Sequence, residues 1–190
     1  MKNEIRALLR KKREDIPPLK RSRNSKKIAL NILRNPKLSL GNRLGFYFAS
    51  KYEVNTKMLI NAFLNHGKEV FLPIIEGKEI FFARYDPQRT TMIENRYGIG
   101  EPSRLEANMV SPSSLDTVFL PILGYNSACY RLGMGGGFYD RSFQNLKEKS
   151  PIRIGLAFSF QEVTFEPESH DVPLFGICTE DGVTFRNERK

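Results

Sequence analysis

The chain has 190 residues, of which 40% are hydrophobic, so it is long enough to bury a core and is expected to form one domain over residues 1–190. No apolar run approaches the roughly 20 residues of a membrane-spanning helix, and the N-terminus lacks the apolar segment of a secretory signal, which favours a soluble protein. The net charge of +9 comes almost entirely from residues 1–27, where eleven Lys and Arg face three acidic residues.

The N-terminal third of the chain predicts two helices. Residues 2–13 predict an amphipathic helix that ends before Pro17, with apolar side chains at spacings of three and four: Ile5, Leu8 and Leu9. Basic side chains line a neighbouring face of this helix: Lys2, Arg6, Arg10 and Arg13. Residues 26–33 predict a second helix, which ends before Pro36.

Short apolar segments alternate with helices along the rest of the chain. Strands are expected at residues 44–49, 69–75, 78–85, 117–123 and 152–158, with two more within 176–185. Helices are expected at residues 56–65 and 139–149, and residues 86–116 are rich in loops. This order predicts an α/β fold: a layered, Rossmann-like sheet of mainly parallel strands flanked by helices, with a basic N-terminal helix.

The stretch RLGMGGGFYDR, residues 131–141, holds four glycines in five positions between a predicted strand and a predicted helix. Backbone N–H groups at a helix start and the positive end of the helix dipole favour phosphate. The pattern is neither GxxxxGK[ST] nor GxGxxG, because Phe138 stands where the second pattern needs glycine. The stretch is a candidate phosphate-binding loop, with a tight turn that only permits close packing as the alternative.

Charged side chains flank this loop. Arg131 and Arg141 are suited to bidentate binding of phosphate, and Asp140 is suited to holding the Mg²⁺ that accompanies phosphates. Each also has a simpler interpretation. Asp140 lies in the first turn of the predicted helix, where the dipole favours an acid, and Arg141 matches an ordinary surface arginine.

The basic N-terminal segment fits several partners. Nucleic acid, an acidic membrane surface or a polyanionic small molecule would each match its charge, and a solvated helix face needs no partner. A nucleic-acid-binding module would use residues 6–27 to follow phosphates and the aromatic strands to stack on bases, but it leaves the glycine loop unexplained. Cys129 and Cys178 form no CxxC pattern, so we expect two free thiols and a cytoplasmic location.

Three segments together resemble the 5-formyltetrahydrofolate cyclo-ligase family over nearly the whole chain: KNEIRALLRKK, RLGMGGGFYDR and QEVTFEPESHDVPL. The resemblance implies an ATP loop made of Arg131, Leu132, Gly133, Met134, Gly135, Gly136, Gly137, Phe138 and Tyr139. It also implies that Lys2 and Arg6 touch the nucleotide. For folate it implies contacts with Phe48, Glu53, Met134, Gly135, Gly136, Gly137 and Phe138. It assigns Mg²⁺ to Asp140 and Asp171, and catalytic roles to Arg131, Tyr139 and Arg141.

The resemblance further implies the ATP- and Mg²⁺-dependent conversion of 5-formyltetrahydrofolate to 5,10-methenyltetrahydrofolate. ATP phosphorylates the formyl oxygen, N10 attacks the activated carbon, and ADP and phosphate are released. Phosphoryl transfer needs positioning and charge neutralisation rather than a Ser-His-Asp nucleophile, which agrees with a chain that holds two histidines. The expected partner is a folate with one or several glutamates, bound by a monomer without nucleic acid or membrane. An ATP-dependent kinase or ligase that acts on another acceptor is the alternative.

The chain departs from the family pattern at several positions. Met134 and Gly136 stand where some relatives carry arginine and lysine, so backbone amides are expected to bind more of the phosphate. Cys129 stands where glycine is frequent, and Glu101-Pro102 is a shared feature without an assigned role. The remaining departures are Asn126, Phe138 and Phe175.

Overall fold

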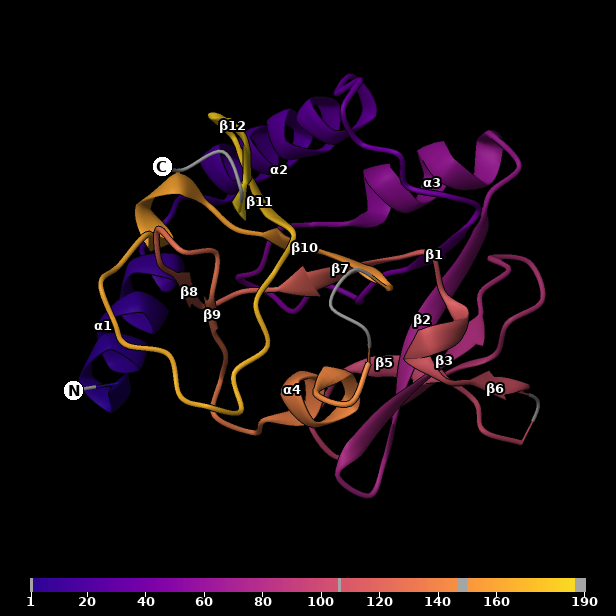
Figure 1. Cartoon of the computed structure of the whole chain (residues 1–190). Coiled ribbons are helices and arrows are strands. Elements are labelled where there is room, and N and C mark those ends of the chain that lie inside the picture. The colour runs from indigo at the N-terminus through magenta and orange to yellow at the C-terminus, as the bar shows by residue number, and fades with distance from the viewer. Residues whose placement is uncertain (1, 106, 147–149, 187–190) are drawn as a thin grey trace.

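A mixed eight-stranded sheet forms the centre of the protein (Figure 1). The computed structural model describes residues 2–105, 107–146 and 150–186. The strands lie in the order β12 (Gly182–Phe185), β11 (Gly176–Thr179), β10 (Ile152–Leu156), β7 (Thr117–Pro121), β1 (Arg43–Gly45), β2 (Glu69–Glu76), β3 (Glu79–Arg84) and β6 (Met109–Val110). Neighbours from β11 to β2 pair in parallel, while β12, β3 and β6 pair antiparallel at the edges. The predicted α/β fold with mainly parallel strands is confirmed.

The central strands bury side chains on both faces, because successive residues point to opposite sides of a strand. Val70 and Leu72 of β2 share a core with α2 (Pro18–Leu33) and α3 (Lys57–Asn65). Phe71 lies between them and shares the opposite core with Phe143 of α4 (Phe138–Phe143). Figure 1 shows α2 and α3 above the sheet and α4 below it. The sheet is therefore a middle layer between two sets of helices.

The helix α1 (Lys2–Glu14) packs beside a small hairpin of β8 (Gly124–Tyr125) and β9 (Arg131–Leu132) (Figure 1). Leu9 is completely buried there, in a cluster with Leu123, Leu132 and Phe165. Leu8, expected on the apolar face, is 52% exposed, because the buried stripe of the helix is narrow and follows Leu9. None of the described helices is long and apolar enough to cross a membrane.

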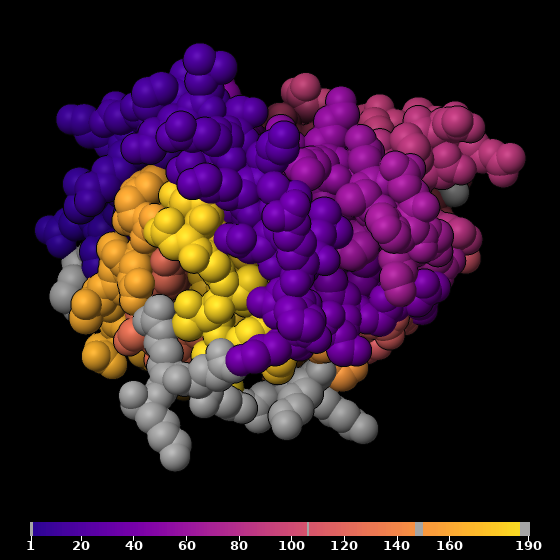
Figure 2. Space-filling view, turned by 90° about the horizontal axis from the view of Figure 1, so that it is seen from above, coloured from indigo at the N-terminus to yellow at the C-terminus, as the bar shows by residue number. Residues whose placement is uncertain are grey.

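The N-terminal and C-terminal parts of the chain lie side by side. Asn31 Nδ2 of α2 donates to the carbonyl oxygen of Thr179 at 2.9 Å, and Asn24 Nδ2 donates to Glu180 Oε1 at 2.8 Å. Figure 2 shows the resulting contact between the indigo and yellow segments on this face of the molecule. Polar side chains of α2 thus anchor the end of β11.

Two predicted elements have wrong boundaries near the N-terminus. The helix α2 begins at Pro18 rather than residue 26, because proline suits the first helical position, where its missing N–H has no partner to lose. The strand β1 is shorter than predicted and ends at Gly45. The following segment turns away from the sheet and is held by Thr56 Oγ1, which donates to the carbonyl oxygen of Tyr47 at 2.8 Å.

The region around the glycine loop also differs from the prediction. The short strand β9, rather than the longer β7, precedes the loop. The helix α4 ends at Phe143, and residues 147–149 of the predicted helix lie outside the described residues. The loop-rich region contains a second hairpin, β4 (Met92–Glu94) with β5 (Gly100–Pro102), and a 3₁₀ turn, η1 (Pro112–Ser114). A further 3₁₀ turn, η2 (Ser159–Gln161), follows β10.

Candidate functional site

The glycine loop joins β9 to α4, and its backbone requires glycine. Gly135 and Gly137 have φ angles of +104° and +63°, which L side chains rarely adopt. A Cβ on Gly133 would lie 2.8 Å from Arg131 Nη1, and a Cβ on Gly136 would lie 2.8 Å from the ring of Phe138. The glycines therefore allow a tight turn. Such a turn is compatible with phosphate binding, and close packing alone would also need it.

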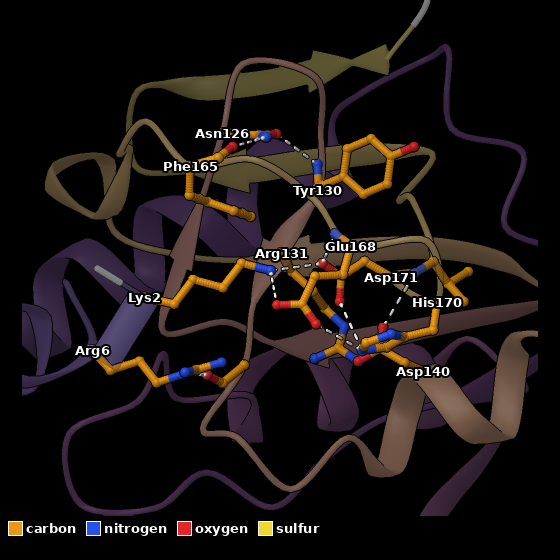
Figure 3. Close-up of polar contacts among 12 residues, drawn as sticks. Lys2, Arg6, Asn126, Tyr130, Arg131, Asp140, Phe165, Glu168, His170 and Asp171 are labelled. Atoms are coloured by element: carbon orange, nitrogen blue, oxygen red, sulfur yellow. Dashed lines mark hydrogen bonds and ion pairs between the residues drawn. The ribbon is translucent and has the colours of Figure 1, made fainter. Parts of the chain in front are cut away.

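Cations from α1 reach across to this loop. Arg6 Nε donates to the carbonyl oxygen of Gly133 at 3.0 Å, and Arg10 Nη2 lies 3.4 Å from the carbonyl oxygen of Met134. Because residues four apart share a helix face, Lys2 also points to this side (Figure 3). Two members of the predicted row of basic side chains, Arg6 and Arg10, thus contact the predicted loop.

Arg13, the last cation of this row, is buried instead. Its side chain packs inside the protein at 5% exposure, and Nη1 lies 3.4 Å from the carbonyl oxygen of Ile122. Burial lowers the pKa of Arg13, an effect partly offset by the carboxylate of Glu53.

Arg131 and Asp140 form an ion pair at the two ends of the loop. Arg131 Nη2 lies 2.6 Å from Asp140 Oδ2, and the two side chains are 6% and 14% exposed. Asp140 Oδ1 also accepts a hydrogen bond from the backbone N–H of Val172 at 3.3 Å. The Arg131 guanidinium lies 5.3 Å from the centre of the Tyr139 ring. Arg131, Tyr139 and Asp140 are therefore brought together, and the roles assigned to them from the sequence stay predictions.

A second charged cluster surrounds Lys2 (Figure 3). Lys2 Nζ lies 2.8 Å from Glu168 Oε1 and 3.2 Å from Asp171 Oδ2, and His170 Nε2 lies 3.3 Å from Glu168 Oε2. Burial alone would lower the pKa of Lys2, but hydrogen bonds to the two carboxylates raise it above its usual value. The same contact with Lys2 lowers the pKa of Glu168.

The two predicted Mg²⁺ ligands lie in one region, because Asp140 is hydrogen-bonded to the residue that follows Asp171. Mg²⁺ is commonly held by one or two carboxylates together with substrate phosphates, and two aspartates beside the glycine loop fit that pattern. Among the residues that the structure describes, no three His, Cys, Asp or Glu side chains are grouped to hold a metal ion without such a substrate.

The predicted folate residues occupy the segment after β1. Phe46 and Tyr47 are buried, whereas Phe48 is 39% exposed and meets Tyr85 edge to face at 6.2 Å. Glu53 Oε2 accepts a hydrogen bond from the backbone N–H of Ser50 at 2.9 Å, which orients its carboxylate. Phe48 is thus the aromatic side chain of this segment that is free to meet a ligand surface.

Glu53 is electrostatically linked to the loop through Tyr139. Burial raises the pKa of the Tyr139 hydroxyl, the Arg131 cation lowers it, and the Glu53 carboxylate raises it. The candidate folate residue and the candidate ATP loop therefore influence the same hydroxyl group.

Arg141 has a clear structural task. Its Nε donates to the carbonyl oxygen of Lys78 at 2.9 Å, its Nη2 donates to that of Gly136 at 2.7 Å, and its guanidinium lies 5.3 Å from the centre of the Phe138 ring. These contacts hold the loop against the turn between β2 and β3.

Several residues had no role assigned to them from the sequence. Arg10 belonged to the predicted row of basic side chains, and the structure places it against the loop. Glu101, 3% exposed, accepts a hydrogen bond from Asn95 Nδ2 at 3.0 Å and so braces the hairpin of β4 and β5. Cys129 has a φ of +59°, which explains why glycine is frequent at its position. Glu168 gave no signal in the sequence.

Asn126 organises the turn between β8 and β9. Its Oδ1 accepts hydrogen bonds from the backbone N–H groups of Ala128 and Tyr130, and its Nδ2 donates to the carbonyl oxygen of Phe165 at 3.1 Å (Figure 3). Asn126 thus supplies the acceptor that this turn needs, and it links the hairpin to the segment that leads to Glu168.

Many α/β enzymes bind phosphate-containing ligands at a glycine loop that precedes a helix, and the three-layer fold and the loop of this chain fit that class. The model of the 5-formyltetrahydrofolate cyclo-ligase family matches residues 1–180. This chain belongs to that family.

Individual relatives agree with the family match. The chain is 35% identical to a 5-formyltetrahydrofolate cyclo-ligase of Haemophilus influenzae, covering 93% of this chain and 96% of the relative. It is 30% identical to the enzyme of that name from Escherichia coli K12, covering 90% and 96%. The solved structure of Aquifex aeolicus 5,10-methenyltetrahydrofolate synthetase matches with a TM-score of 0.84 at 29% identity, covering 100% of this chain and 94% of that one. The family assignment favours the enzyme over the nucleic-acid-binding alternative.

Proposed function

We propose that this chain converts 5-formyltetrahydrofolate to 5,10-methenyltetrahydrofolate with consumption of ATP, and that the glycine loop and α1 bind the nucleotide. The observation that carries the proposal is that Arg6 and Arg10 of α1 hydrogen-bond to the loop, while Lys2 of the same helix lies against Glu168 and Asp171 (Figure 3). These residues lie more than 120 positions from their contacts in the chain. Their convergence gives a polyanion a site to which two distant segments contribute.

The reaction has two steps that place different demands on the protein. In the first, the γ-phosphoryl group of ATP is transferred to the N5-formyl oxygen, which turns a poor leaving group into a good one. In the second, N10 attacks the activated carbon and phosphate departs. Both steps depend on positioning and on neutralising developing negative charge, so cations and backbone N–H groups are the main requirements.

The proposed roles are those that the family resemblance implies, and the positions of the side chains support them. Lys2, Arg6 and residues 131–139 bind ATP, with Arg131 placed to neutralise phosphate charge. Asp140 and Asp171 would hold Mg²⁺, which when bound neutralises charge on the phosphate oxygens. The family resemblance gives Arg141 a catalytic role, and its two hydrogen bonds to backbone carbonyls support a positioning action on the loop.

The folate side of the site is proposed on separate observations. Phe48 offers a partly exposed ring to the pterin, and the oriented carboxylate of Glu53 is suited to accept hydrogen bonds from pterin N–H groups. The family resemblance assigns residues 134–138 to both substrates, which supports a place for them between ATP and folate. Met134 is 53% exposed, so its side chain is accessible to a ligand.

Activity is tested by mixing the protein, 5-formyltetrahydrofolate, ATP and Mg²⁺ and following the near-ultraviolet absorbance of the conjugated product. We expect an ATP-dependent rise that falls about tenfold or more in Asp140→Asn, the effect of losing roughly 1.4 kcal/mol of transition-state stabilisation. Asp181→Asn, in the exposed turn between β11 and β12, is the matched control and should retain activity. Absence of a rise with folded, ATP-binding wild-type protein would instead indicate a kinase or ligase for another acceptor.

Substrate form, assembly and location complete the proposal. We propose a monomer in the cytoplasm, and the location is supported by the buried thiols of Cys129 and Cys178, which are not joined in a disulfide. Folates with several glutamates are proposed as substrates, because the cations of Arg21 and Lys51 gather at one aromatic ring, 5.4 and 5.3 Å from the centre of Tyr52, where a chain of carboxylates could meet them.

We predict that a folate with three glutamates binds more tightly than one with a single glutamate, because the added carboxylates meet these two cations. Dissociation constants for both ligands, measured by calorimetry on wild-type protein and on Lys51→Gln, provide the check. The variant should narrow the difference, and equal affinities for both folates in the wild type would contradict the prediction.

A further inference from the structure

Lys2 is already paired with protein carboxylates in this structure. Its ammonium group lies 2.8 Å from Glu168 Oε1 and 3.2 Å from Asp171 Oδ2 (Figure 3). The raised pKa of Lys2 and the lowered pKa of Glu168 agree with a pair that is ionised on both sides. A nucleotide that binds Lys2 therefore meets a cation that is not free.

The two carboxylates differ in how firmly they are held. Asp171 Oδ2 also accepts a hydrogen bond from the backbone N–H of Glu168 at 2.8 Å, and its side chain is 16% exposed. The side chain of Glu168 is 54% exposed, and His170 Nε2 lies 3.3 Å from its second oxygen. Of the two carboxylates, Glu168 can move toward solvent without breaking a backbone hydrogen bond that fixes the segment.

A phosphate group and Glu168 cannot both occupy the same side of Lys2. Each is an anion that accepts a hydrogen bond from the ammonium group, and like charges at such a distance repel. The retained pairing with Asp171 keeps the Lys2 side chain near the loop after Glu168 leaves. The change needs one exposed side chain to rotate and no movement of the main chain.

We propose that Glu168 takes the place of a phosphate oxygen on Lys2 when no nucleotide is bound, and that it determines nucleotide affinity by competing for this cation. The inference rests on the proposed role of Lys2 in binding ATP. In the free protein Glu168 neutralises the charge of Lys2. When a ligand of higher negative charge binds, Glu168 leaves Lys2 and the ligand takes its place. It acts on affinity and is not a catalytic residue.

The test measures ATP binding by calorimetry in the absence of folate, with Mg²⁺ and again with a chelator. We expect Glu168→Gln to tighten ATP binding by about two- to fivefold, the range for an exposed ion pair, under both conditions. Glu166→Gln removes the same charge from an exposed position two residues earlier and should leave the dissociation constant nearly unchanged. In a Lys2→Gln background the effect of Glu168→Gln should disappear.

The outcomes separate this inference from the proposed function. Weaker binding by Glu168→Gln would show that Glu168 orients Lys2 for the ligand and would overturn the competition. If Glu168→Gln tightens ATP binding equally in the Lys2→Gln background, or if Glu166→Gln tightens it as much, the effect comes from the net charge of the protein. Either result would also overturn the proposed competition. If Lys2→Gln alone leaves ATP affinity unchanged, the proposed role of Lys2 fails and the inference fails with it.

Discussion

At the scale of single residues, the pair of Arg131 and Asp140 has the largest consequences for the site. Both side chains are largely buried, and Asp140 also receives the N–H of Val172, so one carboxylate joins the loop, α4 and the segment around residue 170. A buried pair is expensive to break from one side, because the remaining charge loses its partner without regaining water.

We predict that Arg131→Gln lowers the free energy of unfolding by about 3 kcal/mol and abolishes most activity, because Asp140 is left as an unpaired buried anion. Urea denaturation followed by circular dichroism gives the stability. The double variant Arg131→Gln with Asp140→Asn should recover part of the lost stability but not the activity. A single variant as stable as the wild type would show that the pair contributes nothing to the fold.

At the scale of elements, the loop and the short helix after it depend on backbone conformations that sequence patterns describe poorly. Gly137 is the residue that precedes α4, and it lies in the left-handed region. Gly67 follows α3 in a similar conformation, with a φ of +72° and open space around its Cβ position. In the sequence it lies more than 60 residues from the glycine loop. The two glycines form a matched pair for separating stability from binding.

We predict that Gly137→Ala and Gly67→Ala each destabilise the protein by about 1 kcal/mol, because an L side chain is strained at positive φ. Only Gly137→Ala should raise the KM for ATP, since a Cβ there would also lie 2.7 Å from Arg141 Nη1. This contact would displace the Arg141 side chain, which holds the loop through its hydrogen bond to Gly136. Thermal unfolding and steady-state kinetics of both variants provide the comparison. A similar KM increase in Gly67→Ala would show that the effect comes from general destabilisation.

At the scale of the whole molecule, the layered core contains ionisable groups that folding removes from water. Burial raises the pKa of the Cys178 thiol to about 12, with a further contribution from the Glu180 carboxylate. Burial likewise raises the pKa of the Tyr47 hydroxyl well above its usual range.

The prediction that residues 1–190 form one domain stays a prediction.

We predict that stability falls as the pH rises above about 8.5, the usual thiol pKa. The unfolded chain then releases a proton that the folded protein retains until about pH 12, so each such group reduces the free energy of unfolding by up to about 1.4 kcal/mol per pH unit. Urea unfolding from pH 7 to 10.5 should show a smaller decrease for Cys178→Ala than for the wild type. Parallel curves would mean that Cys178 does not titrate differently in the two states.

Local patterns in the sequence were sufficient for the α/β class, for the basic helix α1 and for the glycine loop. They succeed because hydrophobic spacing, proline and glycine act over a few neighbouring residues. The same patterns misplaced the start of α2 and the end of β1, where Pro18 and the contact between Thr56 and Tyr47 decide the boundary.

What only the tertiary structure decided is how charges far apart in the chain pair with one another. Lys2 meets Glu168 and Asp171 across 166 and 169 positions of sequence, and no local pattern reports which carboxylate reaches which cation. The sequence by itself determined the kinds of residue at the site and the family resemblance. The pairing of these charges follows from tertiary packing. Leu9 packs against the hairpin of β8 and β9, and this contact places α1 beside the loop.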